Sequence, residues 1–317
     1  MAINQAVRMI LKALSFDGIE VEAARYLADL KRLDPMKIFY KTIDYEIYNG
    51  EYRVPTRIFF PDEQAFRDEA LQNAAAVKPK ALLFIHGGGW VTESIDNYER
   101  ICAQLANATG HFVVSVGYRL APENKFPVGL EDCYAVAKAL FTQQFLINIK
   151  PEDITVIGDS AGGNLTAALS LLARDRGIFI PKRQILIYPA VSSDFSENAP
   201  FESVHENGSD YLLTGGRLRD YIDLYARDEE DKLNPYFAPI YATDFSNQPK
   251  TLILTAEYDP LRDEGEAYGL KLEQAGNFVR QYRIADALHG FFALGIKHFY
   301  VEESFGYINE FLKETEE

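Results

Sequence analysis

Short apolar runs alternate with helical stretches over most of the chain after residue 80. The apolar runs are Leu82–Ile85, Phe112–Val116, Ile154–Ile157, Ile185–Tyr188, Thr251–Thr255 and Val279–Ile284, with helical spacing around 97–109, 132–145, 163–175, 264–275 and 300–313. Strands that are apolar on both faces and separated by helices are typical of a mostly parallel sheet covered on both sides. The pattern therefore predicts an α/β fold, in which ligands bind at the carboxyl ends of the strands.

A β-hairpin is predicted ahead of this region. Residues 43–48 and 54–60 are β-rich, and Asn49-Gly50 lies between them. Asn-Gly between two such runs is a strong hairpin signal. Residues 61–80 have no strand character, so we expect them to form a long, mobile surface connection that is partly helical.

One interval breaks the alternation of strands and helices. About sixty residues separate Val191 from Thr251, with a helical pattern near 214–227. An ordinary crossover is much shorter, so this interval predicts an inserted lid. Two amphipathic helical patterns open the chain, the second over Val21–Leu33; the first comprises Ile3, Val7, Ile10, Leu11 and Leu14. They lack the cationic face of a membrane-surface helix, and we expect them to pack on the protein body and the lid.

Composition and charge restrict the classes of partner. The 317 residues are 47% hydrophobic and 25% charged, as in a soluble globular protein, and the net charge is −15. This charge disfavours nucleic acid and acidic membranes. Cys102 and Cys133 form neither a metal knuckle nor a disulfide framework, and we expect them to be reduced and at least half-buried on helices. Charged Arg8 and Lys12 interrupt the first apolar stretch, so we expect no signal peptide and a cytoplasmic location.

The sharpest chemical signal is Gly158-Asp159-Ser160-Ala161-Gly162-Gly163. It follows an apolar run and precedes a helical stretch, which is the context that a G-x-S-x-G nucleophile elbow requires. A helix N-cap serine behind a glycine turn is the simpler reading of these residues. The preceding strand favours Ser160 as a nucleophile at a helix N-terminus, where the dipole favours negative charge.

A serine nucleophile needs a base, and the base needs a carboxylate. Among the five histidines, His289 fits the base because it follows the last β-rich run. Asp259 follows the run that begins at Thr251, which gives the chain order Ser, Asp, His expected of an α/β-hydrolase. Asp263 is the competing carboxylate and Glu257 a weaker one.

The glycines of His86-Gly87-Gly88-Gly89-Trp90 follow the run Leu82–Ile85. Acyl transfer develops an oxyanion that needs backbone N–H donors, and consecutive glycines let the backbone approach it closely. On its own the motif is also compatible with a plain loop or an anion-binding nest. Paired with a nucleophile elbow, it predicts an oxyanion loop.

The chain resembles the hormone-sensitive-lipase-like carboxylesterases over about residues 80–295. The motifs that carry the resemblance are His86–Trp90, Tyr118–Glu123, Phe126-Pro127, Glu131-Asp132, Gly158–Leu165, Asp259–Gly265 and His289–Phe291. The resemblance implies an eight-stranded sheet with a helical cap. It implies a cap from residues 1–40 and 192–235, and a catalytic core from residues 41–191 and 236–317.

Carried over by position, the resemblance gives each motif residue a role. Ser160 matches the nucleophile, Asp259 the acid and His289 the base, while His86 is structural. The oxyanion donors are matched by the backbone of Gly88, Gly89 and Ala161, with Gly87 nearby. We also expect Trp90 and Tyr211 to contact the substrate.

The resulting hypothesis is a serine carboxylesterase that cleaves small esters of short to medium acids, with no metal and no organic cofactor. An amidase, lactonase or deacetylase would use the same residues. A ligand receptor on this fold is a further alternative, although the complete triad argues against it. The run Val279–Ile284 is a candidate sheet edge, where Arg280 and Arg283 would discourage pairing, and homodimerisation stays open.

Overall fold

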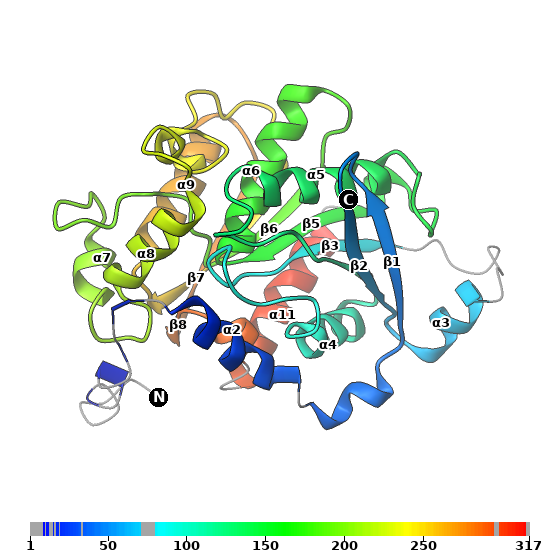
Figure 1. The fold of residues 1–317 in the computed structure, drawn as a ribbon. Helices are drawn as coiled ribbons and strands as arrows, with labels where there is room; N and C mark the ends of the chain where they lie inside the picture. Colours follow the sequence, from blue (N-terminus) through cyan, green and yellow to red (C-terminus); the bar gives the residue numbers. More distant parts are fainter. Residues whose placement is uncertain are drawn as a thin grey trace.

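An eight-stranded sheet runs through the molecule (Figure 1). The computed structural model describes residues 9, 11, 12, 15, 17, 18, 20–32, 34–70, 80–294 and 298–314. In spatial order the strands are β1 (Thr42–Tyr48), β2 (Arg53–Phe59), β4 (Phe112–Val116), β3 (Ala81–Ile85), β5 (Ile154–Asp159), β6 (Arg183–Ile187), β7 (Lys250–Tyr258) and β8 (Val279–Leu288). Strand β2 is antiparallel to β1 and β4, and every later pairing is parallel. The predicted mostly parallel sheet is confirmed.

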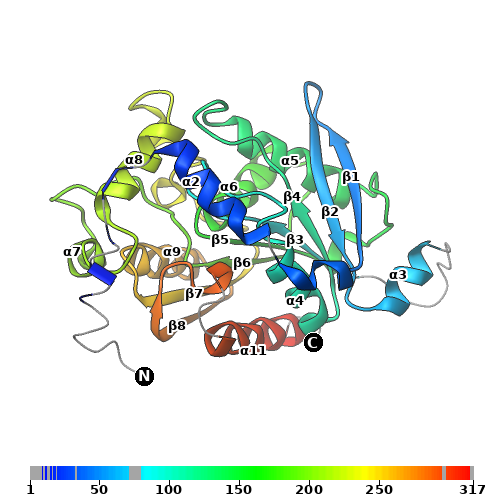
Figure 2. The ribbon, with the colours of Figure 1, turned by 60° about the horizontal axis from the view of Figure 1, so that its bottom comes forward.

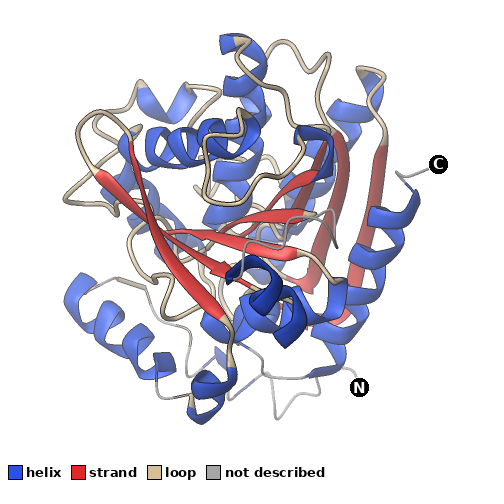
Figure 3. Ribbon diagram, turned by 90° about the vertical axis from the view of Figure 1, so that its right-hand side faces the viewer, coloured by secondary structure: helices blue, strands red, loops and turns tan. Residues whose placement is uncertain are grey.

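Helices cover both faces of the sheet (Figure 3). On one face lie α4 (Glu99–Thr109) and α11 (His298–Glu314); on the other lie α5 (Val128–Phe141), α6 (Ala161–Arg176) and α9 (Arg262–Gln274). The strand residues alternate between the two layers. On β3, for example, Leu82 and Phe84 pack with the α4 layer, whereas Leu83 and Ile85 pack with the α5 and α6 layer. All four are fully buried, which explains why the run is apolar throughout.

The predicted β-hairpin is confirmed, and the described part of the connection after it contains the expected helix. Strands β1 and β2 pair from Thr42 opposite Phe59 to Tyr48 opposite Arg53. Asn49 begins the turn between them, and its side-chain oxygen accepts hydrogen bonds from the N–H groups of Glu51 and Tyr52. The connection is partly helical in α3 (Glu63–Ala70), and residues 71–79 of it lie outside the described residues.

The inserted interval and the N-terminal segment lie together. The interval holds α7 (Glu202–Asn207), α8 (Gly215–Tyr225) and two short 3-10 turns, Asp231–Leu233 and Pro239–Tyr241. In the N-terminal segment, α2 (Val21–Asp29) begins close to α8 (Figure 2), where Gly18 donates its N–H to Asp220, and is followed by the 3-10 turns Leu30–Arg32 and Pro35–Phe39. The predicted helix over residues 3–14 falls largely outside the described residues.

Helix α2 attaches to the body mainly through polar groups. Arg25 donates to the carbonyls of Val91 and Ala121, each at 2.9 Å, and forms a two-pronged ion pair with Glu123 at 2.8 Å. Of the predicted apolar face, Leu27 and Leu30 are exposed. The expected packing of the apolar face on the body is therefore only partly correct: Val21 and Ala28 pack inward, whereas Leu27 and Leu30 face outward.

Further sequence expectations concern the cysteines, the membrane and the sheet edge. Cys102 on α4 and Cys133 on α5 are free and buried. None of the described helices has the length and apolar character needed to cross a bilayer. Strand β8 ends the sheet, and its outward arginines are paired, Arg280 with Glu314 and Arg283 with Glu266.

Candidate active site

Four predicted site segments meet at one edge of the sheet because parallel strands share a direction. The glycine loop follows β3, Ser160 follows β5, Asp259 follows β7 and His289 follows β8. The carboxyl ends of these strands lie at the same edge, so residues far apart in the sequence lie close together in the fold.

Ser160 stands in a strained turn between β5 and α6. Its φ is 53° and its ψ is −120°, a backbone conformation that is rare for residues other than glycine. The turn brings Gly162 against the end of β3, where an added Cβ would lie 2.0 Å from the carbonyl oxygen of Ile85. Only glycine fits this approach, which explains the glycine two residues after the serine.

Ser160, His289 and Asp259 form a continuous hydrogen-bonded chain. Ser160 Oγ lies 2.9 Å from His289 Nε2, and His289 Nδ1 lies 2.7 Å from Asp259 Oδ2. The Asp259 side chain is fully buried, and that of His289 is 12% exposed. Since Asp259 Oδ1 also accepts the N–H of Leu261 at 2.9 Å, the carboxylate is held at both oxygens. The arrangement suits proton transfer between the serine and the imidazole.

The competing carboxylates are engaged elsewhere. Asp263 accepts the backbone N–H of Ser203 at 2.7 Å and pairs with Arg262. Glu257 accepts the N–H of Asp286, also at 2.7 Å. The structure therefore brings Asp259 to the histidine and uses the other two acids to bind loops.

The carbonyl oxygens of the glycine loop are held on one side. The carbonyl of Gly87 contacts His86 Nδ1 at 2.8 Å, and that of Gly88 accepts from the N–H groups of Val91 and Thr92 and from Thr92 Oγ1 at 2.9–3.1 Å. In a trans peptide the N–H points opposite to the C=O. The N–H groups of Gly88 and Gly89 are thus directed to the other side, and both residues line the cavity that contains Ser160.

The backbone N–H groups predicted to bind the oxyanion differ in whether the protein already uses them in a hydrogen bond. In the described part of the chain, the N–H groups of Gly88, Gly89 and Ala161 have no protein acceptor. Ala161 begins α6, so its N–H is one of the free donors of a helix N-terminus. The N–H of Gly87 instead donates to Asp159 at 2.9 Å, so Gly87 braces the loop.

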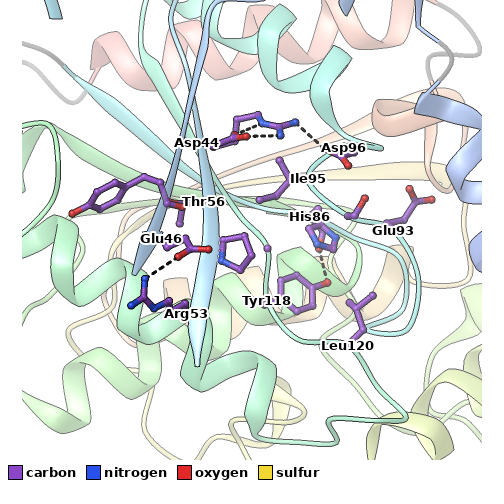
Figure 4. Close-up of a pocket in the computed structure, with 15 residues that line it drawn as sticks. Asp44, Glu46, Arg53, Thr56, His86, Glu93, Ile95, Asp96, Tyr118 and Leu120 are labelled. Atoms are coloured by element: carbon purple, nitrogen blue, oxygen red, sulfur yellow. Dashed lines mark hydrogen bonds and ion pairs between the residues drawn. The ribbon is translucent and has the colours of Figure 1, made fainter. Parts of the chain in front are cut away.

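The far side of the loop borders an open groove of about 820 Å³, shown in Figure 4. There the ring of Tyr118 stacks on His86 with centroids 4.4 Å apart, and its hydroxyl donates to the His86 carbonyl at 2.9 Å. The outer walls come from the hairpin and the 93–96 segment, with acids such as Asp44 and Asp96 bound to Arg57. The pair of His86 and Tyr118 therefore supports the loop from behind.

Asp159 supports the same loop from the catalytic side. Its fully buried carboxylate accepts from Gly87 N–H, from Tyr98 Oη at 2.9 Å and from Tyr188 Oη at 3.3 Å. Burial raises the pKa of the Asp159 carboxyl to about 6, although these donors favour the ionised form.

A cavity of about 210 Å³ lies over Ser160. Trp90 lines it, with its indole stacked on Tyr225 at 4.7 Å. Tyr211, the other residue expected to contact the substrate, lies outside this lining, and its ring stacks on Tyr258 at 5.0 Å. From the inserted interval, the residues that line the cavity are Leu212, Leu213, Arg217, Leu218 and Tyr221. The helical spacing of 214–227 was the signal that could have identified Leu218 and Tyr221, which lie three residues apart on one face of α8.

Glu264 is a second buried carboxyl near the site. It is fully buried, and its Oε1 accepts the N–H groups of Val191 at 2.7 Å and Ser192 at 3.0 Å, where the chain leaves the sheet for the inserted interval. Its Oε2 is buried and has no hydrogen-bond partner among the described residues. Burial raises the pKa of this carboxyl to about 8.

This pKa predicts how Glu264 affects stability. From about pH 4.5 to about pH 8 the folded protein retains a proton that the unfolded chain has lost, so Glu264 makes folding less favourable as the pH rises. In Glu264→Gln this dependence is absent. We expect the free energy of unfolding of the variant to rise relative to wild type across this window, by up to about 1.4 kcal/mol per pH unit. Urea unfolding at several pH values measures the difference, and a pH-independent difference would contradict the prediction.

Comparison with known proteins agrees with this geometry. The family profile described as the alpha/beta hydrolase fold matches residues 82–293. An arylesterase of Saccharolobus solfataricus is 35% identical over 87% of this chain and 84% of its own length. An ethyl acetate hydrolase of Pseudomonas putida is 38% identical over 77% of this chain and 73% of its own. The solved structure of a hyperthermophilic esterase from Pyrobaculum calidifontis superposes with a TM-score of 0.85, at 33% identity over 99% of both chains. The chain therefore belongs to the hormone-sensitive-lipase-like carboxylesterases, a family of the α/β-hydrolase fold.

Proposed function

We propose that this protein is a serine carboxylesterase in which Ser160 forms the acyl-enzyme. The observation that carries the proposal is the hydrogen-bonded chain from Ser160 through His289 to the buried Asp259. His289 Nε2 removes the proton of Ser160 as Oγ attacks the ester carbonyl carbon. Asp259 holds the imidazole in the required tautomer and stabilises the imidazolium.

The carbonyl oxygen gains a negative charge when Ser160 attacks. The N–H groups of Gly88, Gly89 and Ala161 stabilise this oxyanion by donating hydrogen bonds to it. The contacts within the glycine loop orient these donors before the reaction begins. The tetrahedral intermediate then collapses, and the alcohol leaves with the proton from His289. A water molecule repeats the sequence on the acyl-enzyme, with His289 again as the base, and releases the acid and free Ser160. Each chemical step requires only groups of this chain and water.

The cavity predicts the size of the acyl group. Its volume of about 210 Å³ is below the ~300–1,000 Å³ of pockets that hold drug-sized ligands. We expect kcat/KM for p-nitrophenyl esters to be highest for acetate or butyrate and to fall steeply toward laurate. Turnover of the chain-length series measures this, and an optimum at octanoate or longer would contradict the proposed size limit. The matching p-nitroanilides, tested in parallel, separate an esterase from an amidase.

Covalent labelling tests the nucleophile independently of the substrate. A fluorophosphonate should add one phosphonyl group per chain, and the modified peptide should contain Ser160. Labelling of another residue, or none in a correctly folded sample, would remove the basis of the proposal.

We further propose that residues 1–40 and 192–235 form a cap on a catalytic core of residues 41–191 and 236–317. Contacts between Ser15 or Asp17 and the inserted interval support this division.

The free, buried cysteines support a cytoplasmic location, since reduced thiols are usual there. The end position of β8 leaves a strand edge that a second copy could pair with.

A further inference from the structure

The proposed oxyanion loop contains two glycines in conformations that rotate easily. Gly88 has a φ of 99° and Gly89 a φ of 59°, and glycine has little intrinsic preference that would hold these values. A useful oxyanion hole must be held in place before the charge develops. The peptide between the two glycines is fixed at its carbonyl end by the contacts of Gly88 O with Val91 and Thr92. The donor lies at the Gly89 end of this planar peptide, so a group that packs on Gly89 further limits the movement of the donor.

The ring of Tyr221 lies directly against Gly89. A Cβ added at Gly89 would come within 2.4–2.6 Å of three adjacent ring carbons of Tyr221, and these are its three nearest atoms. Tyr221 belongs to α8 of the inserted interval, and it also lines the cavity over Ser160. A cap side chain therefore touches the backbone of the proposed oxyanion loop.

The position of Tyr221 depends in turn on the N-terminal segment. Thr214, the N-cap of α8, donates from its hydroxyl to Asp17 at 2.6 Å. Asp220 accepts the N–H of Gly18 at 3.1 Å, one residue before Tyr221. A rigid helix that is held at both places keeps the Tyr221 ring at a fixed height over Gly89.

From this packing we infer that Tyr221 is a positioning residue for the oxyanion hole, which it supports by holding the Gly89 peptide in place. The inference rests on the proposed function and adds that closure of the cap and geometry of the hole are coupled. Tyr221 acts through Gly89 and takes no part in proton transfer.

The test compares three variants on p-nitrophenyl acetate, whose acyl group is too small to need an acyl-pocket wall. Tyr221→Phe keeps the ring and should retain wild-type kcat within about threefold. Tyr221→Ala removes the ring, and a displacement of the donor by about 1 Å should lower kcat by about 10²-fold with little change in KM. Leu224→Ala is the matched control, since Leu224 is a partly buried apolar side chain of the same helix that lies outside the cavity lining. It should leave kcat for acetate near wild type.

A trifluoromethyl ketone gives a second readout, because its hemiketal with Ser160 places an oxyanion in the hole. Tyr221→Ala should weaken this inhibitor in proportion to its loss of kcat/KM, whereas Tyr221→Phe should not. If Tyr221 only lines the acyl pocket, Tyr221→Ala will keep its kcat on acetate, accept longer esters and bind the ketone normally, and the inference is then wrong. Wild-type turnover tests the proposed function separately, so a failure of either idea can be recognised.

Discussion

Replacing Ser160 with alanine should lower kcat for p-nitrophenyl acetate by about 10⁶-fold, to the residual rate that binding and oxyanion stabilisation alone provide. The variant lacks the side-chain oxygen that forms the acyl-enzyme in the proposed mechanism, and His289 then has no serine hydroxyl to activate. Stopped-flow or plate assays at matched folded concentration measure the loss. The thermal unfolding midpoint should change little, because the removed hydroxyl is partly exposed and makes one side-chain hydrogen bond.

Ser170→Ala is a suitable control for this result. Ser170 lies on the same helix, α6, and within the part of the chain that the structure describes its buried hydroxyl has no hydrogen-bond partner. Removing an unpaired hydroxyl costs little or even stabilises the fold, so activity should stay at the wild-type level. If Ser160→Ala retains more than about one hundredth of the wild-type rate, well above the loss expected for a nucleophile, another residue forms the acyl-enzyme.

Replacing Asp259 with asparagine should lower kcat by about 10⁴-fold. The amide has nearly the same shape, but its NH₂ group can donate to His289 Nδ1, which favours the tautomer that cannot accept the proton of Ser160. The short contact of 2.7 Å between Nδ1 and Oδ2 leaves no room for an intervening water to correct this. Binding should be affected much less, so the loss should appear in kcat and not in KM.

Comparing Asp263→Asn with Asp259→Asn tests which of the two candidate carboxylates orients His289. Asp263 holds the Ser203 backbone and Arg262, so its replacement should cost stability and leave kcat within about threefold of wild type. If Asp263→Asn lowers kcat more than Asp259→Asn does, Asp263 and not Asp259 is the acid of the triad.

Local patterns were sufficient to predict the fold and the candidate nucleophile. The run Ile154–Ile157, the glycine turn and the helical stretch after it are neighbours in the sequence, and backbone geometry alone requires glycine where Gly162 approaches β3. The apolar strands predicted a parallel sheet covered on both faces, and this prediction is confirmed. The prediction was possible because a strand that is buried on both faces is apolar at nearly every position. The same logic placed candidate groups after β3, β7 and β8, since the ends of parallel strands share an edge.

Groups with similar sequence surroundings take different positions because of long-range packing. Asp259 and Asp263 are four residues apart, and their roles differ because the start of α9 turns one toward His289 and the other toward Ser203. Tyr211 and Tyr221 both lie in the inserted interval, yet one stacks on Tyr258 and the other on Gly89. Such differences depend on side-chain directions and on contacts between segments far apart in the chain, which no periodicity records. The sheet, the elbow and the set of candidate groups thus follow from local sequence patterns, whereas contacts between distant segments select which of those groups meet.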